Sequence, residues 1–141
     1  MIHSVVHQLR QTRLFSALQR GDLEAVADLV HQDRYPRGTT VFEQGEPGTA
    51  CYLLLSGELR AVRVDPEGIK REVDYLVQGD FFGESSLLLG ERHDATLEAT
   101  EDAALLIIEK DDFDALLEHR PWIRKDLQLT REVERSLRAP R

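Results

Sequence analysis

The spacing of apolar residues changes twice along the chain. In the first 34 residues it follows the three-to-four-residue period of a helix. The apolar positions of this part are Leu9, Leu14, Phe15, Leu18, Leu23, Val26, Leu29 and Val30. The pattern predicts N-terminal helices within residues 1–36, with a break at Gly21, Asp22 as the N-cap of the second helix, and an end at Pro36.

Strand-like runs occupy the middle of the chain, from residue 39 to about 109. They read TTVFE, ACYLLLSGELRAVRV, KREVDYLV, ATLEAT and ALLIIE. Asp65-Pro66-Glu67-Gly68 has Pro and Gly where a tight β-turn favours them, which predicts a hairpin. Many short strands at close spacing indicate a sandwich or barrel, so we expect a β-roll over residues 37–110.

Helical spacing returns after the roll. The apolar positions here are Phe113, Leu116, Leu117, Ile123, Leu127, Val133 and Leu137, with Pro121 at a helix start. We expect C-terminal helices over 111–138, and one α+β, mainly β domain over 1–141. The stripe from Pro121 to Leu137 suits a homodimer through this helix, although Thr130 and Glu134 interrupt it.

Composition narrows the classes of partner. The net charge of −8 disfavours a surface that binds nucleic acid or an anionic membrane as a whole. One cysteine, Cys51, rules out an internal disulfide framework, fits a reducing compartment, and lies in an apolar run where we expect a buried, inert thiol. No run approaches the ~20 apolar residues of a membrane span. These features predict a cytoplasmic protein.

One stretch, GDFFGESSLLLGERHDATLEAT at residues 79–100, combines turn glycines, a carboxylate, hydroxyls and basic residues. A short helix beginning near Glu84 would point unpaired backbone N–H groups at an anion, while Gly79 and Gly83 allow close approach. The Glu84 carboxylate repels phosphate but accepts hydrogen bonds from sugar hydroxyls, a mixture that suits a nucleotide. Alternatively, Glu84 complements the helix dipole and Ser85 and Ser86 cap the helix.

Residues 37–120 resemble the cyclic-nucleotide-binding domain of catabolite-activator-type regulators, kinase regulatory subunits and nucleotide-gated channels. The matching pieces are GTTVFEQGEPGTACYLLLSGELRAVRVDPEG and GDFFGESSLLLGERHDATLEATEDAALLIIEKDDFDALLEHRP. The resemblance implies an antiparallel β-roll, or double-stranded jelly roll, flanked by helices. It also implies a regulatory sensor that binds cAMP or cGMP and signals through movement of its C-terminal helices, without a cofactor.

The resemblance further implies a phosphate-binding cassette at residues 82–96. Phe82, Gly83 and Glu84 fall on the family's Phe-Gly-Glu, in which the glutamate binds the ribose 2'-hydroxyl. Ser85 and Ser86 fall where backbone amides meet the cyclic phosphate. Leu87, Leu88 and Leu89 match its apolar positions, although Leu88 and Leu89 equally suit plain core. The remaining expected ligand-binding residues are Arg92, His93, Ala95 and Thr96.

The chain departs from the family at the residue that pairs with the phosphate. His93 stands in place of the usual arginine, Arg92 in place of proline, and Asp94 in place of a small residue. Loss of the arginine contact weakens a complex roughly 10- to 100-fold. Three alternatives are open: Arg92 replaces the arginine, protonated His93 replaces it, or the site has changed to another ligand or to none.

Other chemistry has little support in the sequence. No Ser-His-Asp spacing or Gly-x-Ser-x-Gly turn is present, so we expect no enzyme, and we expect no metal site. Bacterial relatives carry a DNA-binding helix-turn-helix beyond the last helix, for which 141 residues leave no room, so we expect no direct DNA binding. The alternatives to a sensor domain are a ligand-free interaction module and the sensor fragment of a larger transcription regulator.

Overall fold

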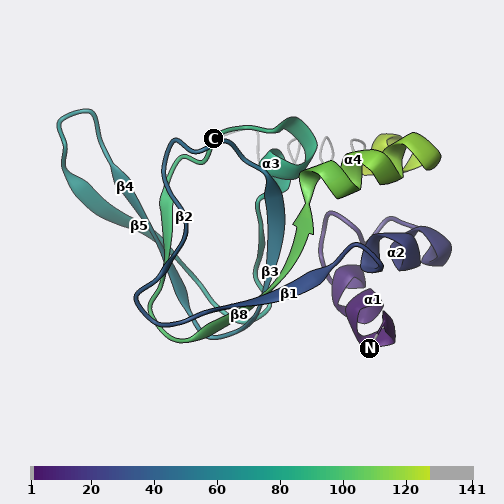
Figure 1. Ribbon diagram of the computed structural model, residues 1–141, viewed down its shortest axis with the longest axis horizontal. Coiled ribbons are helices and arrows are strands. Elements are labelled where there is room, and N and C mark those ends of the chain that lie inside the picture. Colours follow the sequence, from purple (N-terminus) through teal and green to yellow (C-terminus); the bar gives the residue numbers. More distant parts are fainter. Residues whose placement is uncertain (1, 128–141) are drawn as a thin grey trace, which may run out of the picture. The chain divides into compact units, whose positions relative to one another are not determined.

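The computed structural model describes residues 2–127 of the 141-residue chain (Figure 1). The described residues form two compact units, of which one is His31–Lys110 and the other consists of the residues before and after it. The first unit contains β1 (His31–Tyr35), β2 (Thr40–Phe42), β3 (Ala50–Ser56), β4 (Leu59–Val64), β5 (Lys70–Leu76), β6 (Phe81–Phe82), α3 (Glu84–Leu89), β7 (Thr96–Ala99) and β8 (Ala103–Glu109).

The strands form two four-stranded sheets in which every pairing is antiparallel. The orders are β1-β8-β3-β6 and β2-β7-β4-β5. Strands β3 and β8, both rich in buried residues, pair with each other in the interior of the first sheet. The predicted α+β, mainly β class and the antiparallel β-roll are confirmed.

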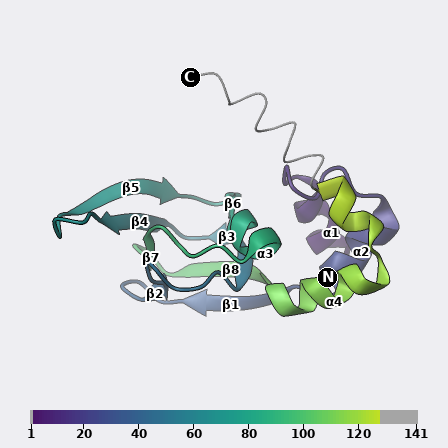
Figure 2. The ribbon, with the colours of Figure 1, turned by 90° about the horizontal axis from the view of Figure 1, so that it is seen from above.

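The hairpin predicted at residues 65–68 joins β4 to β5. Asp65 fixes the turn because its carboxylate accepts hydrogen bonds from the backbone N–H groups of Glu67 and Ile69, at 3.0 and 2.9 Å. The Gly68 N–H donates to the Asp65 carbonyl at 2.9 Å, which closes the turn. Figure 2 shows this hairpin extending beyond the other strands of the roll.

The core of the roll lies between the inward faces of the two sheets. It is built from the buried residues Ala50, Tyr52, Leu54, Leu59, Leu97, Ala99, Ala103, Leu105 and Ile107. Cys51, also on β3, is fully buried, and desolvation raises the pKa of its thiol, with the Glu84 carboxylate as the second cause. A buried thiol with a raised pKa is unreactive, as the sequence predicted.

The prediction of helices throughout residues 1–36 is wrong at His31–Tyr35, which form strand β1. This strand lies at an edge of its sheet, and its side chains are almost all exposed. The strand therefore lacks the alternation of apolar and polar residues by which a sequence predicts a strand. Pairing with β8, from His31 opposite Ile107 to Tyr35 opposite Ala103, stabilises it instead.

The second unit contains α1 (Ile2–Arg10), α2 (Arg20–Ala27) and most of α4 (Lys110–His119), followed by helical residues 122–127. The rings of Phe15 and Phe113 pack edge to face with centroids 6.2 Å apart. Gly21 does not break the helical part, because it lies inside α2, whose N-cap is Gln19.

Asp22 is not the N-cap either. It is buried in the first turn of α2, where its carboxylate accepts hydrogen bonds from Arg120 Nη1 at 2.8 Å and Trp122 Nε1 at 3.0 Å. Arg120 and Trp122 follow the end of α4. Asp22 thus joins two segments of this unit that are about a hundred residues apart in the sequence.

The start of a helix after Pro121 is confirmed. Of the apolar stripe proposed to pair two copies, Ile123 and Leu127 are fully buried, and Val133 and Leu137 lie outside the described residues. Ile123 and Leu127 are therefore not available as a dimer surface in this arrangement. Between residues 2 and 127, no helix has the length and apolar character needed to cross a membrane.

Candidate functional site

Gly83 positions the predicted cassette. Its φ of +90° is a left-handed conformation that favours glycine, and it immediately precedes α3. A Cβ at this position would lie 2.9 Å from the Ala50 carbonyl oxygen and 3.0 Å from Cys51 Cα. Glycine therefore serves both the turn and the close approach of α3 to β3. Glu84, partly buried, is the first residue of the helix.

The serines of α3 do not cap it. The N-cap is Gly83, and Ser85 and Ser86 both lie within the helix. Ser86 is buried, and its hydroxyl donates to the Glu91 carbonyl at 3.4 Å. A Cβ on Gly48 would clash with the Ser86 hydroxyl, so the loop before β3 packs directly against α3. Of the three leucines, Leu87 and Leu88 are core, whereas Leu89 is 57% exposed and is not plain core.

The segment after α3, residues 91–94, is held by backbone hydrogen bonds on both sides. The Glu91 N–H donates to the Ser85 carbonyl at 3.4 Å. The His93 N–H donates to the Glu46 carbonyl at 3.0 Å, and the His93 carbonyl accepts from the Gly45 N–H at 2.8 Å. The structure thus brings α3, the 43–46 turn and the segment with Arg92, His93 and Asp94 together.

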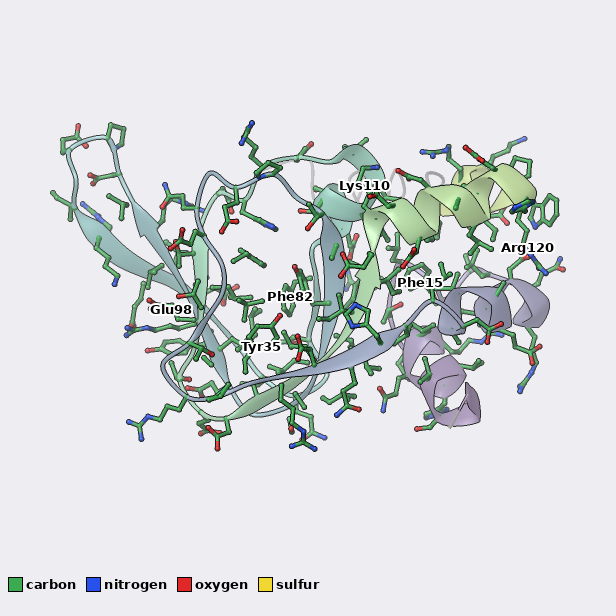
Figure 3. All side chains as sticks on the ribbon, in the orientation of Figure 1. Phe15, Tyr35, Phe82, Glu98, Lys110 and Arg120 are labelled. Atoms are coloured by element: carbon green, nitrogen blue, oxygen red, sulfur yellow. The ribbon has the colours of Figure 1, made fainter. Side chains whose placement is uncertain are left out.

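His93 makes an aromatic contact with Phe42 of β2. The two rings are stacked, with centroids 3.6 Å apart and planes inclined by 7°. Phe42 also lies against Tyr52 and Phe82, whose own rings stack at 5.0 Å. His93 therefore extends a layer of aromatic rings inside the roll, where Figure 3 shows Phe82 and Tyr35.

Burial disfavours the imidazolium form of His93. Desolvation lowers its pKa from the usual value of 6.5, although Glu46 and Asp94 oppose this effect. The hypothesis that protonated His93 replaces the family arginine thus requires a charge that the surroundings disfavour near neutral pH.

Arg92 and Asp94, on either side of His93, each have a partner. The Arg92 guanidinium donates to the Gly45 carbonyl at 2.8 Å. Asp94 binds Arg63 of β4 twice: Arg63 Nη2 is 3.0 Å from a carboxylate oxygen, and Arg63 Nε donates to the Asp94 carbonyl at 2.9 Å. The negative charge that Asp94 adds to the cassette is thus balanced by Arg63.

The cassette ends at the start of β7. Ala95 is buried, and the Thr96 hydroxyl accepts a hydrogen bond from the backbone N–H of Gln44 at 2.9 Å. The Gln44 side chain in turn pairs with both backbone groups of Val64 at 2.8 and 2.9 Å. Sequence reasoning missed Arg63, Gln44 and Phe42, because each reaches the cassette from a distant strand or turn.

The cassette contacts Lys110, the last residue of the same unit and the first residue of α4. Lys110 donates from its backbone N–H to the Thr49 carbonyl at 2.7 Å and from Nζ to the Leu87 carbonyl at 3.5 Å. A Cβ on Gly90, the C-cap of α3, would lie 3.3 Å from Lys110 Cε. The end of α3 and Lys110 are therefore in contact.

The roll and its cassette match a known family. The family model of the cyclic nucleotide-binding domain matches residues 32–120, and the chain belongs to this family of regulatory domains. The chain is 38% identical over 109 residues to a cAMP-dependent protein kinase regulatory subunit of Aspergillus fumigatus, covering 77% of this chain and 26% of that protein. It is 32% identical over 119 residues to the cyclic AMP receptor protein of Thermus thermophilus, covering 84% and 55%.

A solved structure has a similar fold. The N-terminal domain of a transcriptional regulator from Streptomyces coelicolor superposes with a TM-score of 0.80 at 27% identity, covering 93% of this chain and 92% of that domain. Since this chain spans about a quarter and about half of the two curated relatives, the comparisons describe a domain of those proteins and not their whole length.

Proposed function

We propose that this domain is a sensor that binds a cyclic nucleotide, cAMP or cGMP, at residues 82–96. The observation that carries the proposal is the conformation of the cassette: Gly83 at φ +90° packs α3 against β3 and places Glu84 at the start of the helix. Membership of the family supports it. So do the two curated relatives, both named for cyclic AMP.

In this proposal Glu84 accepts hydrogen bonds from the ribose hydroxyl, and the backbone amides of Ser85 and Ser86 meet the cyclic phosphate. The carboxylate is partly buried, so a hydrogen bond to it is less exposed to competition from water. Ala95 and Thr96 complete the site, with Thr96 held by the backbone of Gln44. No enzymatic step is proposed.

We also propose that occupancy is passed on through the C-terminal helices. Support comes from Lys110, which begins α4 and contacts the Leu87 carbonyl of the cassette helix. A ligand that binds better to one position of α3 than to another shifts the equilibrium between them. Such a shift acts on the first residue of α4 directly.

Isothermal titration of the native domain with cAMP and with cGMP tests the proposal. Glu84→Gln should weaken binding roughly 10-fold or more, because a charge-assisted hydrogen bond is lost. Glu91→Gln is the matched control, since it removes an exposed carboxylate from the same segment. Equal affinities for the native protein and Glu84→Gln would contradict the proposed site.

The second candidate is the ligand-free interaction module. One observation favours it: His93, at the position of the family arginine, is stacked on Phe42. Absence of binding to both nucleotides in the native protein, at concentrations up to the millimolar range, would support this candidate over the sensor.

A further inference from the structure

A ligand with an anionic phosphate needs a cation that the cassette itself does not readily supply. His93 is stacked on Phe42, and its surroundings disfavour the charged form. Arg92 donates to the Gly45 carbonyl, in the turn that also fixes the His93 backbone. A further basic side chain, Arg63, reaches the same segment from another strand.

Arg63 is bound to the cassette in an exchangeable way. It makes two contacts with Asp94, the residue next to His93. Both side chains face solvent, with 46% of Arg63 and 86% of Asp94 exposed. An exposed ion pair contributes only about 0–1 kcal/mol, so Arg63 can exchange one anionic partner for another at small cost. Phosphate is a suitable second partner, because a guanidinium binds it through two parallel hydrogen bonds.

A second arginine lies directly across the hairpin from the first. In the register of β4 and β5, Arg63 is opposite Arg71. Like charges opposite each other destabilise a pair of strands unless an anion balances them. Each arginine has one carboxylate partner: Asp94 lies 3.0 Å from Arg63, and Asp65 lies 3.9 Å from Arg71, the longer and weaker of the two pairs.

We propose that Arg63, assisted by Arg71, is the residue that binds the cyclic phosphate of the nucleotide in this protein. The proposal rests on the proposed function and names the cation for that same site. Asp94 is then an internal competitor for the phosphate: it holds Arg63 at the cassette without ligand and releases it when the phosphate binds. The cost of that release lowers affinity, so Asp94 tunes the response to higher ligand concentrations.

Titration of the native domain and of Arg63 variants with cAMP tests this role. Arg63→Gln should weaken binding about 10-fold, the lower end for a lost charge-assisted contact, because Arg63 is 46% exposed. Arg63→Lys should retain part of the affinity, because it keeps the charge but not the planar fork. Arg34→Gln is the matched control, because it makes the same change of charge on β1, in the other sheet.

Asp94→Asn supplies a second test. It should increase the affinity for cAMP, a result that a misfolded variant would not give. Removing the competitor should tighten cAMP binding several-fold, and the gain should vanish in the double variant Asp94→Asn/Arg63→Gln. A gain that persists without Arg63 would mean that only the charge of Asp94 matters, and would overturn the proposal. A loss of affinity in Asp94→Asn, with an unfolding midpoint like that of the native domain, would overturn it as well.

The outcomes separate the two proposals. If the native domain binds cAMP and Arg63→Gln binds it equally well, the sensor function stands and the role of Arg63 is wrong. If the native domain binds neither cAMP nor cGMP, the proposed function fails, and the role of Arg63 fails with it.

Discussion

The imidazole of His93 lies flat on the ring of Phe42, with 3.6 Å between the ring centroids. The two residues come from different elements, β2 and the segment that follows α3, so the contact fixes the cassette to the roll. Desolvation by burial is the largest cause of the lowered pKa of His93. At the position where the resemblance implies an arginine, this chain thus has an aromatic contact.

The lowered pKa of His93 predicts a pH-dependent stability. An unfolded histidine titrates near pH 6.5, whereas folded His93 takes up its proton at lower pH. As the pH falls below about 6.5, the unfolded chain gains the proton first, and the native state loses stability. His93→Phe keeps an aromatic ring but cannot titrate, so its unfolding midpoint should fall less between pH 7.5 and pH 5.5. Parallel pH profiles for the two proteins would show that His93 has no such effect.

The affinity for cyclic nucleotide should not change with pH above pH 7. His93 offers a positive charge to the phosphate only when it is protonated, hence below about pH 6.5. We expect cAMP affinity to be nearly constant between pH 8 and pH 7, and any increase to occur only at lower pH. Titration calorimetry at four pH values measures this. A steep increase between pH 8 and pH 7, absent in His93→Phe, would contradict the lowered pKa.

Restoring the family arginine should increase affinity. His93→Arg places a permanent charge at the position where the family binds the phosphate, which predicts a roughly 10- to 100-fold tighter complex with cAMP. His31→Arg is the control, because it makes the same exchange at an exposed histidine of β1 that pairs with Glu109. Unchanged affinity in His93→Arg would mean that residue 93 does not contribute to phosphate binding.

Features of the sequence that act locally predicted much of the fold. The turn at Asp65, the apolar runs of β3 and β8, and the glycine before α3 each carry their signal within a few residues. Strand β1 carries none, because its stability comes from pairing with β8, 70 or so residues later. Arg63 and Phe42 contact the cassette across strands, and such contacts depend on register and on side-chain direction, which a local pattern does not contain.

Replacing Gly83 with alanine should destabilise the domain for two separable reasons. Alanine at φ +90° costs about 1–2 kcal/mol of backbone strain, and its Cβ would meet the Ala50 carbonyl at 2.9 Å, which adds a packing cost of about 1–3 kcal/mol. Gly79→Ala is the matched control, since its φ is +95° but nothing lies within 4 Å of a Cβ there. Urea unfolding should rank Gly83→Ala clearly below Gly79→Ala. Equal losses would mean that packing against β3 is unimportant.

Asp22 should stabilise the helical unit through its buried carboxylate. Asp22→Ala removes the acceptor for Arg120 and Trp122, and hydrogen bonds to charged groups contribute about 1.5–3 kcal/mol, towards the lower end here because Arg120 is 37% exposed. Urea unfolding measures the loss, and Asp28→Ala, at the exposed C-cap of α2, is the control. Trp122 is the only tryptophan, so its fluorescence should change in Asp22→Ala and not in Asp28→Ala. An unchanged spectrum with unchanged stability would show that this contact does not hold the two segments together.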